Sequence, residues 1–200
     1  MVSRTRAQSP ARSRVIVLIA VGAAFMSGLD LFVVNVAFDQ IGVSLGVGTD
    51  GGPTIADMSW ILNIYAVVYA ALLVPLGRIA DRYGRKTVFV GGLALFVAAS
   101  AACALSGNVW MLVLFRGLQA AGAAAMAPTS LSILMAALPP EKRIGGVRMW
   151  SATGAAAAAL GPTIGGFLTG ISWHWVFLIN LPIGVVLLWL AVRHVRDTEH

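Results

Sequence analysis

The sequence predicts an all-α polytopic membrane protein built from six transmembrane helices. Of its 200 residues, 58% are hydrophobic and only 11% are charged, and the mean hydropathy is +0.86. A soluble domain carries about 25% charged residues and has no means of covering so much apolar surface. The apolar residues also gather in segments of about 20, the length that crosses roughly 30 Å of hydrocarbon.

Six segments have this length and apolarity. No long stretch alternates with a period of two, and a helix satisfies every backbone polar group within its own segment, so each span is interpreted as a helix. The spans cover residues 15–37, 59–77, 87–106, 109–136, 149–171 and 175–192. The first apolar stretch is too long for a signal peptide and is interpreted as an uncleaved span. Residues 15–192 thus form one six-span unit, between a basic tail at 1–14 and the start of a linker at 193–200.

The basic residues divide the connections between spans into two sides. Every lysine and arginine except Arg116 lies in a terminal tail or in the connections after the second and fourth spans. The opposite connections, 38–58, 107–108 and 172–174, contain none. Because positively charged loops stay in the cytoplasm, both termini are predicted to be cytoplasmic in a multi-pass protein of the cell membrane.

The opposite side is therefore predicted to face outward. Segment 38–58 is expected to be its one long loop, because it is rich in glycine and acidic residues. Amphipathic indole rings prefer the membrane–water interface, so Trp110, Trp173 and Trp175 are expected at the outer interface.

The composition also excludes several classes of function. The net charge of +6 is scattered between apolar spans, so no basic patch for nucleic acid is present. The single cysteine, Cys103, lies within a span and forms neither an intrachain disulfide nor a metal cluster. The sequence contains no H-E-x-x-H, no G-x-S-x-G and no phosphate-binding glycine loop. We therefore expect no enzyme, no cofactor or metal site and no nucleic-acid partner.

Two ionisable residues lie inside spans. Asp30 in the first span and Arg116 in the fourth each lie about seven residues from the outer end, roughly 10 Å deep. A lone charge in a membrane costs on the order of 3 kcal/mol, and opposite charges at matched depth reduce this cost. Intramembrane ionisable residues are usually functional, so we expect this pair to belong to a proton or substrate pathway. The alternative is a static ion pair in the bundle interior.

Polar and small residues form a stripe along the helix that contains Arg116. The stripe suits a cavity wall, and close packing of its alanines is the alternative. By helical spacing it contains Gln119, Ala120, Ala123, Ala127 and Ser130.

Hydrogen bonds between helices are favoured for the polar residues Asn35, Asn63, Tyr65, Tyr69 and Asn180. Candidates for a substrate cavity are Asn35, Asn63, Tyr65 and Gln119.

The fifth span carries a face of small residues. Gly154, Ala158, Gly161 and Gly165 lie within about 40° of one another on a helical wheel. Such a face lets another backbone approach closely. Pro162 removes a backbone hydrogen bond and is expected to kink the helix. The face is either a static packing seam or a seam along which two helices rock.

Several of these segments resemble motifs of the major facilitator superfamily. The run Gly77-Arg-Ile-Ala-Asp81-Arg-Tyr-Gly84-Arg85-Lys86 resembles its cytoplasmic signature between the second and third spans, with Ile79 where leucine is usual. The run Leu114-Phe-Arg116-Gly-Leu-Gln119-Ala-Ala-Gly122 resembles its fourth-span motif. The run Gly161-Pro162-Thr-Ile-Gly165-Gly166 resembles its fifth-span antiporter motif, with Ala157 where glycine is frequent.

Two further runs are similar to the fourteen-span drug:proton antiporters of that superfamily. One is Leu29-Asp30-Leu-Phe-Val-Val-Asn35 in the first span, accompanied by Trp60 and Tyr65 in the second. The other is Trp173-His-Trp175-Val-Phe177-Leu-Ile-Asn180-Leu-Pro182-Ile-Gly184. The resemblance covers essentially all of residues 15–192.

The resemblance implies a secondary active transporter that exports hydrophobic drugs or antibiotics in exchange for protons. Asp30 and Arg116 become the residues expected to couple protons. A cytoplasmic latch is expected from Gly77, Asp81, Arg82, Gly84, Arg85 and Lys86. Within it, Gly77 and Gly84 are expected to permit a tight turn between the second and third spans. The antiporter motif comprises Gly161, Pro162, Gly165 and Gly166.

The family's fold has two six-helix halves, and the resemblance covers only the first, a 3+3 pseudo-repeat. The expected partners are therefore protons, hydrophobic small molecules, the lipid bilayer and a missing C-terminal half that encloses the cavity. Two alternatives stay open: a transporter of the same fold with a narrow substrate range, and a truncated six-span membrane protein without transport activity.

Overall fold

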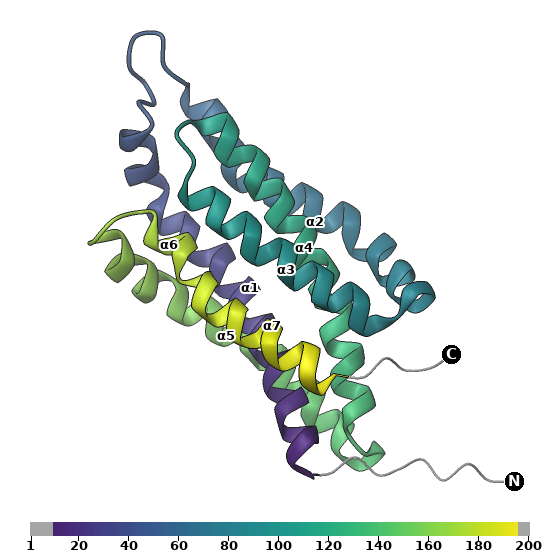
Figure 1. Ribbon diagram of the computed structural model, residues 1–200. Coiled ribbons are helices and arrows are strands. Elements are labelled where there is room, and N and C mark those ends of the chain that lie inside the picture. Colours follow the sequence, from purple (N-terminus) through teal and green to yellow (C-terminus); the bar gives the residue numbers. More distant parts are fainter. Residues whose placement is uncertain (1–9, 196–200) are drawn as a thin grey trace, which may run out of the picture.

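The computed structural model describes residues 10–195, and every regular element in this range is a helix (Figure 1). This confirms the all-α fold class. The elements are α1 (Pro10–Ser44), α2 (Ile55–Tyr83), α3 (Arg85–Ala104), α4 (Val109–Ala137), α5 (Pro140–Thr169), α6 (Trp175–Leu178) and α7 (Asn180–His194).

Five helical segments are long and apolar enough to cross a membrane. They are Arg12–Ser44, Ile55–Tyr83, Arg85–Ala104, Val109–Ala137 and Trp175–His194. Helix α5 is also long enough, at 30 residues, but its glycines and alanines make it less apolar than the other five. That α5 is the remaining membrane crossing stays a prediction.

Several helix boundaries differ from the expected spans. Helix α1 continues to Ser44, so the expected external loop 38–58 shortens to residues 45–54. The basic connection before the fifth span is also shorter, because α5 begins at Pro140 and carries Lys142 and Arg143 on its first turns. Both differences have one cause: the apolar residues end before the helix does, because backbone hydrogen bonding continues into the polar flanks.

The expected sixth span is divided into α6 and α7 at Ile179. Pro182 follows three residues later and has no N–H to donate to the carbonyl of Leu178, which accounts for the division. The residue that begins α7 is Asn180, which is completely buried.

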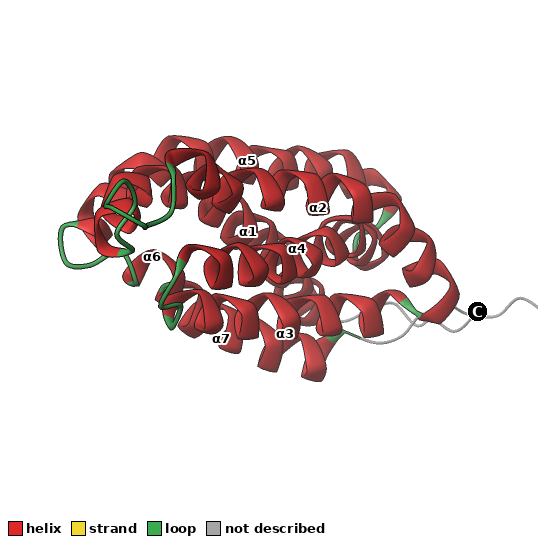
Figure 2. Ribbon diagram, turned by 90° about the horizontal axis from the view of Figure 1, so that it is seen from above, coloured by secondary structure: helices red, strands yellow, loops and turns green. Residues whose placement is uncertain are grey.

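The helices form three layers (Figure 2). Helices α1 and α4 lie in the middle, α2 and α5 lie on one side, and α3 and α7 lie on the other. Of the five membrane-length helices, α4 is the most enclosed, with 61% of its apolar segment buried inside the protein. Only 11% of the apolar segment of α2 is buried. Only six of the 30 residues of α5 are buried, so the layer formed by α2 and α5 leaves much of its surface uncovered by the described residues.

Glycines set how closely the layers approach. A Cβ added to Gly122 of α4 would lie 2.7 Å from the carbonyl oxygen of Gly92 in α3, so these two backbones touch. On the other side, a Cβ at Gly161 of α5 would collide with Phe32 of α1, and one at Gly165 would lie 3.1 Å from Val36. Close packing of α1 on α5 matches the small-residue face expected in the fifth span.

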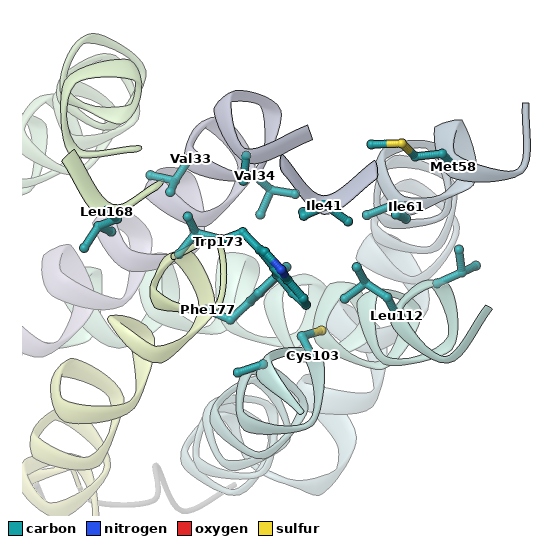
Figure 3. Close-up of a cluster of buried hydrophobic side chains, with 14 of the residues drawn as sticks. Val33, Val34, Ile41, Met58, Ile61, Cys103, Leu112, Leu168, Trp173 and Phe177 are labelled. Carbon is teal, nitrogen blue, oxygen red and sulfur yellow. The ribbon is translucent and has the colours of Figure 1, made fainter. Parts of the chain in front are cut away.

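A hydrophobic cluster fills the end of the bundle next to loop 45–54 (Figure 3). Trp173 lies at its centre with only 4% of its surface exposed, in edge contact with the ring of Phe177. The indole of Trp173 therefore turns inward and packs in the core, and its expected level at the outer membrane interface stays a prediction. Trp110 and Trp175 are 56% and 46% exposed, as interfacial residues would be.

Candidate functional site

The two intramembrane charges meet in the centre of the bundle. Arg116 Nη1 lies 2.6 Å from Asp30 Oδ2, and neither side chain has any exposed surface. Asp30 comes from α1 and Arg116 from α4, the two helices of the middle layer. The sequence predicted opposite charges at matched depth, and the structure brings them into direct contact.

Three N–H groups converge on the Asp30 carboxylate. In addition to Arg116, Gln119 Nε2 donates to Asp30 Oδ1 at 2.8 Å, and Asn180 Nδ2 donates to the same oxygen at 2.9 Å. Gln119 Nε2 also lies 2.7 Å from the hydroxyl of Ser100. The carboxylate therefore joins α1, α4 and α7, and Ser100 adds α3 to the network.

Arg116 has partners besides the carboxylate. Its Nη1 also donates to Gln119 Oε1 at 2.6 Å, and its Nε donates to the backbone carbonyl of Ile61 at 3.4 Å. Its guanidinium carbon lies 4.3 Å from the ring centre of Tyr65 in α2, a cation–π distance. Arg116 Nη2 is buried without a hydrogen-bond partner among the described residues.

These contacts determine what the pair contributes to stability. Removing two charges from water costs several kcal/mol per ion, and a close pair repays this only with good geometry and additional hydrogen bonds. Here a short Asp30–Arg116 contact is accompanied by two neutral amide donors and an aromatic face. Breaking the pair by removing one partner leaves an uncompensated buried charge, which is far more damaging than removing both.

A cavity of 360 Å³ opens beside this network. Helices α1, α2, α4 and α5 line it, and none of its lining residues is charged. The lining includes Ser27, Tyr65, Tyr69, Ser130, Trp150 and Gly154. The hydroxyl of Ser130 donates to its own helix and accepts the indole N–H of Trp150 at 3.1 Å, so these groups satisfy one another. The wall is therefore mainly apolar and aromatic, as small-molecule sites usually are.

The four cavity candidates from the sequence occupy different places. Tyr65 lines the cavity and also lies against Arg116, so it stands between the cavity and the charge network. Gln119 belongs to the network and is not part of the cavity lining. Asn35 and Asn63 are exposed and lie outside the lining, and Asn35 bonds within its own helix to the carbonyl of Leu31.

The expected latch residues lie at the junction of α2 and α3. Arg85 Nη2 lies 3.2 Å from Asp81 Oδ1, and both side chains are substantially exposed. Gly84 has a φ of +99° and makes the turn between the two helices. Gly77 was expected to help make this turn, and that expectation is wrong, because Gly77 lies inside α2 with its Cα facing Pro128 of α4.

Arg82 and Lys86 flank this turn. The guanidinium of Arg82 lies 5.5 Å from the ring of Tyr83, and Lys86 lies in the first turn of α3. The junction thus presents a cluster of cations around the single Asp81 carboxylate at the end of the bundle opposite loop 45–54.

The antiporter-motif residues separate into two groups. Gly161 and Gly165 are buried against α1, whereas Pro162 and Gly166 are exposed. Gly154, which the helical wheel placed on the same face, has no neighbour within 4 Å of a Cβ and lines the cavity instead. The small-residue face therefore packs on α1 in its second half and borders the cavity in its first.

Sequence reasoning missed Ser100, Cys103 and Trp150 as members of the site. Ser100 and Cys103 are buried on α3, and Cys103 Sγ lies 3.9 Å from Gln119 Oε1. Ser100 is an isolated hydroxyl in an apolar span, and that was the available signal. The expectation that Asn180 bonds between helices is confirmed by its bond to Asp30.

The chain is similar to several resistance proteins. The family model described as Major Facilitator Superfamily matches residues 20–200. Fatty acid resistance protein FarB of Neisseria gonorrhoeae is 37% identical, over 88% of this chain and 34% of that protein. Methylenomycin A resistance protein of Streptomyces coelicolor is 39% identical, over 87% and 36%. Probable multidrug resistance protein EmrY of Escherichia coli is 35% identical, over 88% and 34%.

A solved structure has the same fold. It is the crystal structure of a bacterial homologue of the human lysosomal transporter Spinster, in an inward-facing and unoccupied conformation. The TM-score is 0.73 at 21% sequence identity, over 96% of this chain and 45% of that chain. At this identity the likeness concerns the fold alone. The chain spans about a third of the length of the curated relatives and under half of the solved structure.

Removing one member of the ion pair is expected to be worse than removing both. Arg116→Met leaves the Asp30 carboxylate buried without its counter-charge and should lower the unfolding free energy by about 3 kcal/mol. Asp30→Asn combined with Arg116→Met removes both charges, so this double variant should be more stable than Arg116→Met alone. Thermal unfolding of the purified full-length protein in detergent measures both effects. Additive losses from the two substitutions would contradict coupling between the charges.

Proposed function

The chain belongs to the Major Facilitator Superfamily, and on this premise we propose that it is the N-terminal half of a proton-coupled antiporter that exports hydrophobic drugs or antibiotics. The observation that carries the proposal is the Asp30–Arg116 pair, buried beside an uncharged cavity. The names of relatives support the cargo, since EmrY is a probable multidrug resistance protein and another relative is named for resistance to methylenomycin A.

Asp30 is the residue proposed to carry the proton. Ionised, it compensates the charge of Arg116; protonated, it no longer does so. The guanidinium then keeps the carbonyl oxygens of Gln119 and Ile61 and the face of the Tyr65 ring as partners. These neutral contacts make a state with protonated Asp30 and charged Arg116 accessible without exposing the arginine to lipid.

Tyr65 is proposed to connect proton binding with cargo binding. It borders the cavity on one side and lies against Arg116 on the other. A compound in the cavity that shifts the Tyr65 ring therefore changes the surroundings of Arg116, and a proton on Asp30 acts in the reverse direction. Such reciprocity is required of any coupling between two binding sites.

The cavity is proposed to hold the cargo. Its wall of aromatic, aliphatic and satisfied hydroxyl groups suits compounds bound mainly by apolar contact. A second half, beyond this chain, is proposed to cover the exposed layer of α2 and α5 and to complete both the cavity and the latch around Asp81 and Arg85. The exposure of that layer and of the Asp81–Arg85 pair supports this arrangement.

The second candidate function is export of a narrow set of compounds by the same mechanism. The relatives named for resistance to methylenomycin A and to fatty acids favour it, because each name specifies one compound or class. Measuring which compounds the full-length protein exports separates the two candidates.

The basic end of the bundle is proposed to face the cytoplasm, because lysines and arginines gather there. In a cysteine-free background, Asp50→Cys should react with a membrane-impermeant thiol reagent in intact cells. Gly145→Cys has open space around it and serves as the matched probe of the other end. It should react only after permeabilisation. The reverse labelling pattern would overturn the orientation.

Replacing the proposed proton carrier should stop coupled export. In inverted membrane vesicles carrying the full-length protein, we expect Asp30→Asn to abolish ethidium transport driven by a proton gradient. Asp39→Asn removes an exposed carboxylate from the same helix and should leave transport unchanged. Gradient-driven transport that survives Asp30→Asn at the wild-type rate would exclude Asp30 as the proton carrier.

Filling the cavity should reduce export without weakening the fold. Gly154 lines the cavity, and a Cβ added there meets no atom within 4 Å, so we expect Gly154→Leu to lower the export of bulky compounds at an unchanged unfolding temperature. Gly91→Leu, at another open position but on α3, should leave both quantities unchanged. Undiminished export by Gly154→Leu would mean that the cargo binds elsewhere.

A further inference from the structure

The hydrogen bonds around Asp30 are arranged for an ionised carboxylate only. Oδ2 accepts from Arg116, and Oδ1 accepts from Gln119 and from Asn180. All three partners use N–H groups here. A protonated carboxyl has an O–H to donate, and a buried O–H without an acceptor costs about 1–3 kcal/mol. A protonated Asp30 therefore needs an acceptor that this arrangement does not supply.

Two of the three partners are unable to supply it. The guanidinium of Arg116 has no acceptor atom. The carbonyl oxygen of Gln119 already accepts from Arg116 Nη1 at 2.6 Å, and its amide nitrogen bonds to Ser100 at 2.7 Å. Turning the Gln119 amide over would break both bonds and would remove a partner of Arg116 when Asp30 has just lost its negative charge.

Asn180 is the remaining partner, and it has a free acceptor. Its Oδ1 is fully buried and has no hydrogen-bond partner in the described part of the chain, while its Nδ2 donates to Asp30. Rotation about the bond between Cβ and the amide carbon exchanges the positions of these two atoms. The oxygen then occupies the place that the nitrogen holds now, 2.9 Å from Asp30 Oδ1 and 3.4 Å from Ser100 Oγ.

We propose that the side-chain amide of Asn180 turns over when Asp30 takes up a proton, donating to the ionised carboxylate and accepting from the protonated one. The proposal rests on the proposed function, in which Asp30 carries the proton. A proton from water in the cavity adds to Asp30 Oδ1, the bond from Asn180 Nδ2 is lost, and the new O–H donates to Asn180 Oδ1. The unpaired buried atom changes from Oδ1 to Nδ2, so the count of unpaired groups stays the same.

The surroundings allow the amide to respond to Asp30 alone. The titratable side chains around the carboxylate are Arg116, which contacts it, Tyr65, which lies against Arg116, and Cys103, which lies 3.9 Å from Gln119 Oε1. Asn180 lies at the first position of α7, and its described side-chain bonds go only to Asp30 and Ser100. The amide therefore turns over without breaking a bond to Arg116.

Infrared difference spectroscopy tests the proposal on the purified full-length protein with isotope-labelled asparagine. A hydrogen bond at a carbonyl oxygen weakens the C=O bond, so acidification should shift the Asn180 carbonyl band to lower wavenumber. A fixed donor that merely loses the charged carboxylate would shift the same band to higher wavenumber. Asn180→Leu and Asn180→Ser each remove the labelled amide, so either one that folds assigns the band.

Two further variants complete the experiment. Asp30→Asn should abolish the shift. Asn108→Ser should leave it intact, because the serine hydroxyl replaces the Asn108 amide oxygen as the acceptor that caps α4. A band that moves to higher wavenumber or stays in place, with Asp30 still protonated on acidification, overturns the amide rotation alone. Absence of any Asp30-dependent carboxylic acid band overturns both this proposal and the proton-carrying role of Asp30.

Discussion

The buried contact between Asp30 and Arg116 constrains the rest of the bundle. Two charges are stable inside a membrane only if each finds a counter-charge and if its remaining hydrogen-bonding groups find partners. In this chain the partners come from other helices: the amide of Asn180 from α7, the carbonyl of Ile61 from α2 and, through Gln119, the hydroxyl of Ser100 from α3. The pair therefore determines how the layers meet as well as providing a titratable group.

The sequence was sufficient to predict whatever depends on one helix at a time. Apolar length predicted the helices, although flanking polar turns extended α1 and α5 beyond the expected limits. Matched depth predicted that Asp30 and Arg116 lie at one level, and small-residue spacing predicted that Gly161 and Gly165 pack closely. Each of these follows from period and length, which a linear sequence retains.

What depends on several helices was less predictable. Whether Asn180 reaches Asp30 Oδ1 depends on how α7 packs on α1 and α3, and nothing in the spacing of Asn180 specifies that packing. The two glycines with opposite roles in α5 illustrate the same limit. Gly154 and Gly161 occupy one face of the wheel, but only Gly161 reaches α1, because the cavity separates the helices at Gly154.

The coupling proposed for this site needs two arrangements of the network, since a proton shifts a conformational equilibrium only as far as it binds one conformation better than the other. Separating Asp30 from Arg116 requires a change of side-chain rotamer or a movement of α1 relative to α4. Turning the Asn180 amide requires no helix movement at all. The local rotation therefore comes first, because it gives the protonated carboxyl a bond while the helices are still in place. Arg116 then keeps only neutral partners, Gln119 among them. The charge–charge attraction between Asp30 of α1 and Arg116 of α4 is lost. In this proposal, a hydrogen-bond exchange at Asp30 therefore precedes any movement of α1 relative to α4.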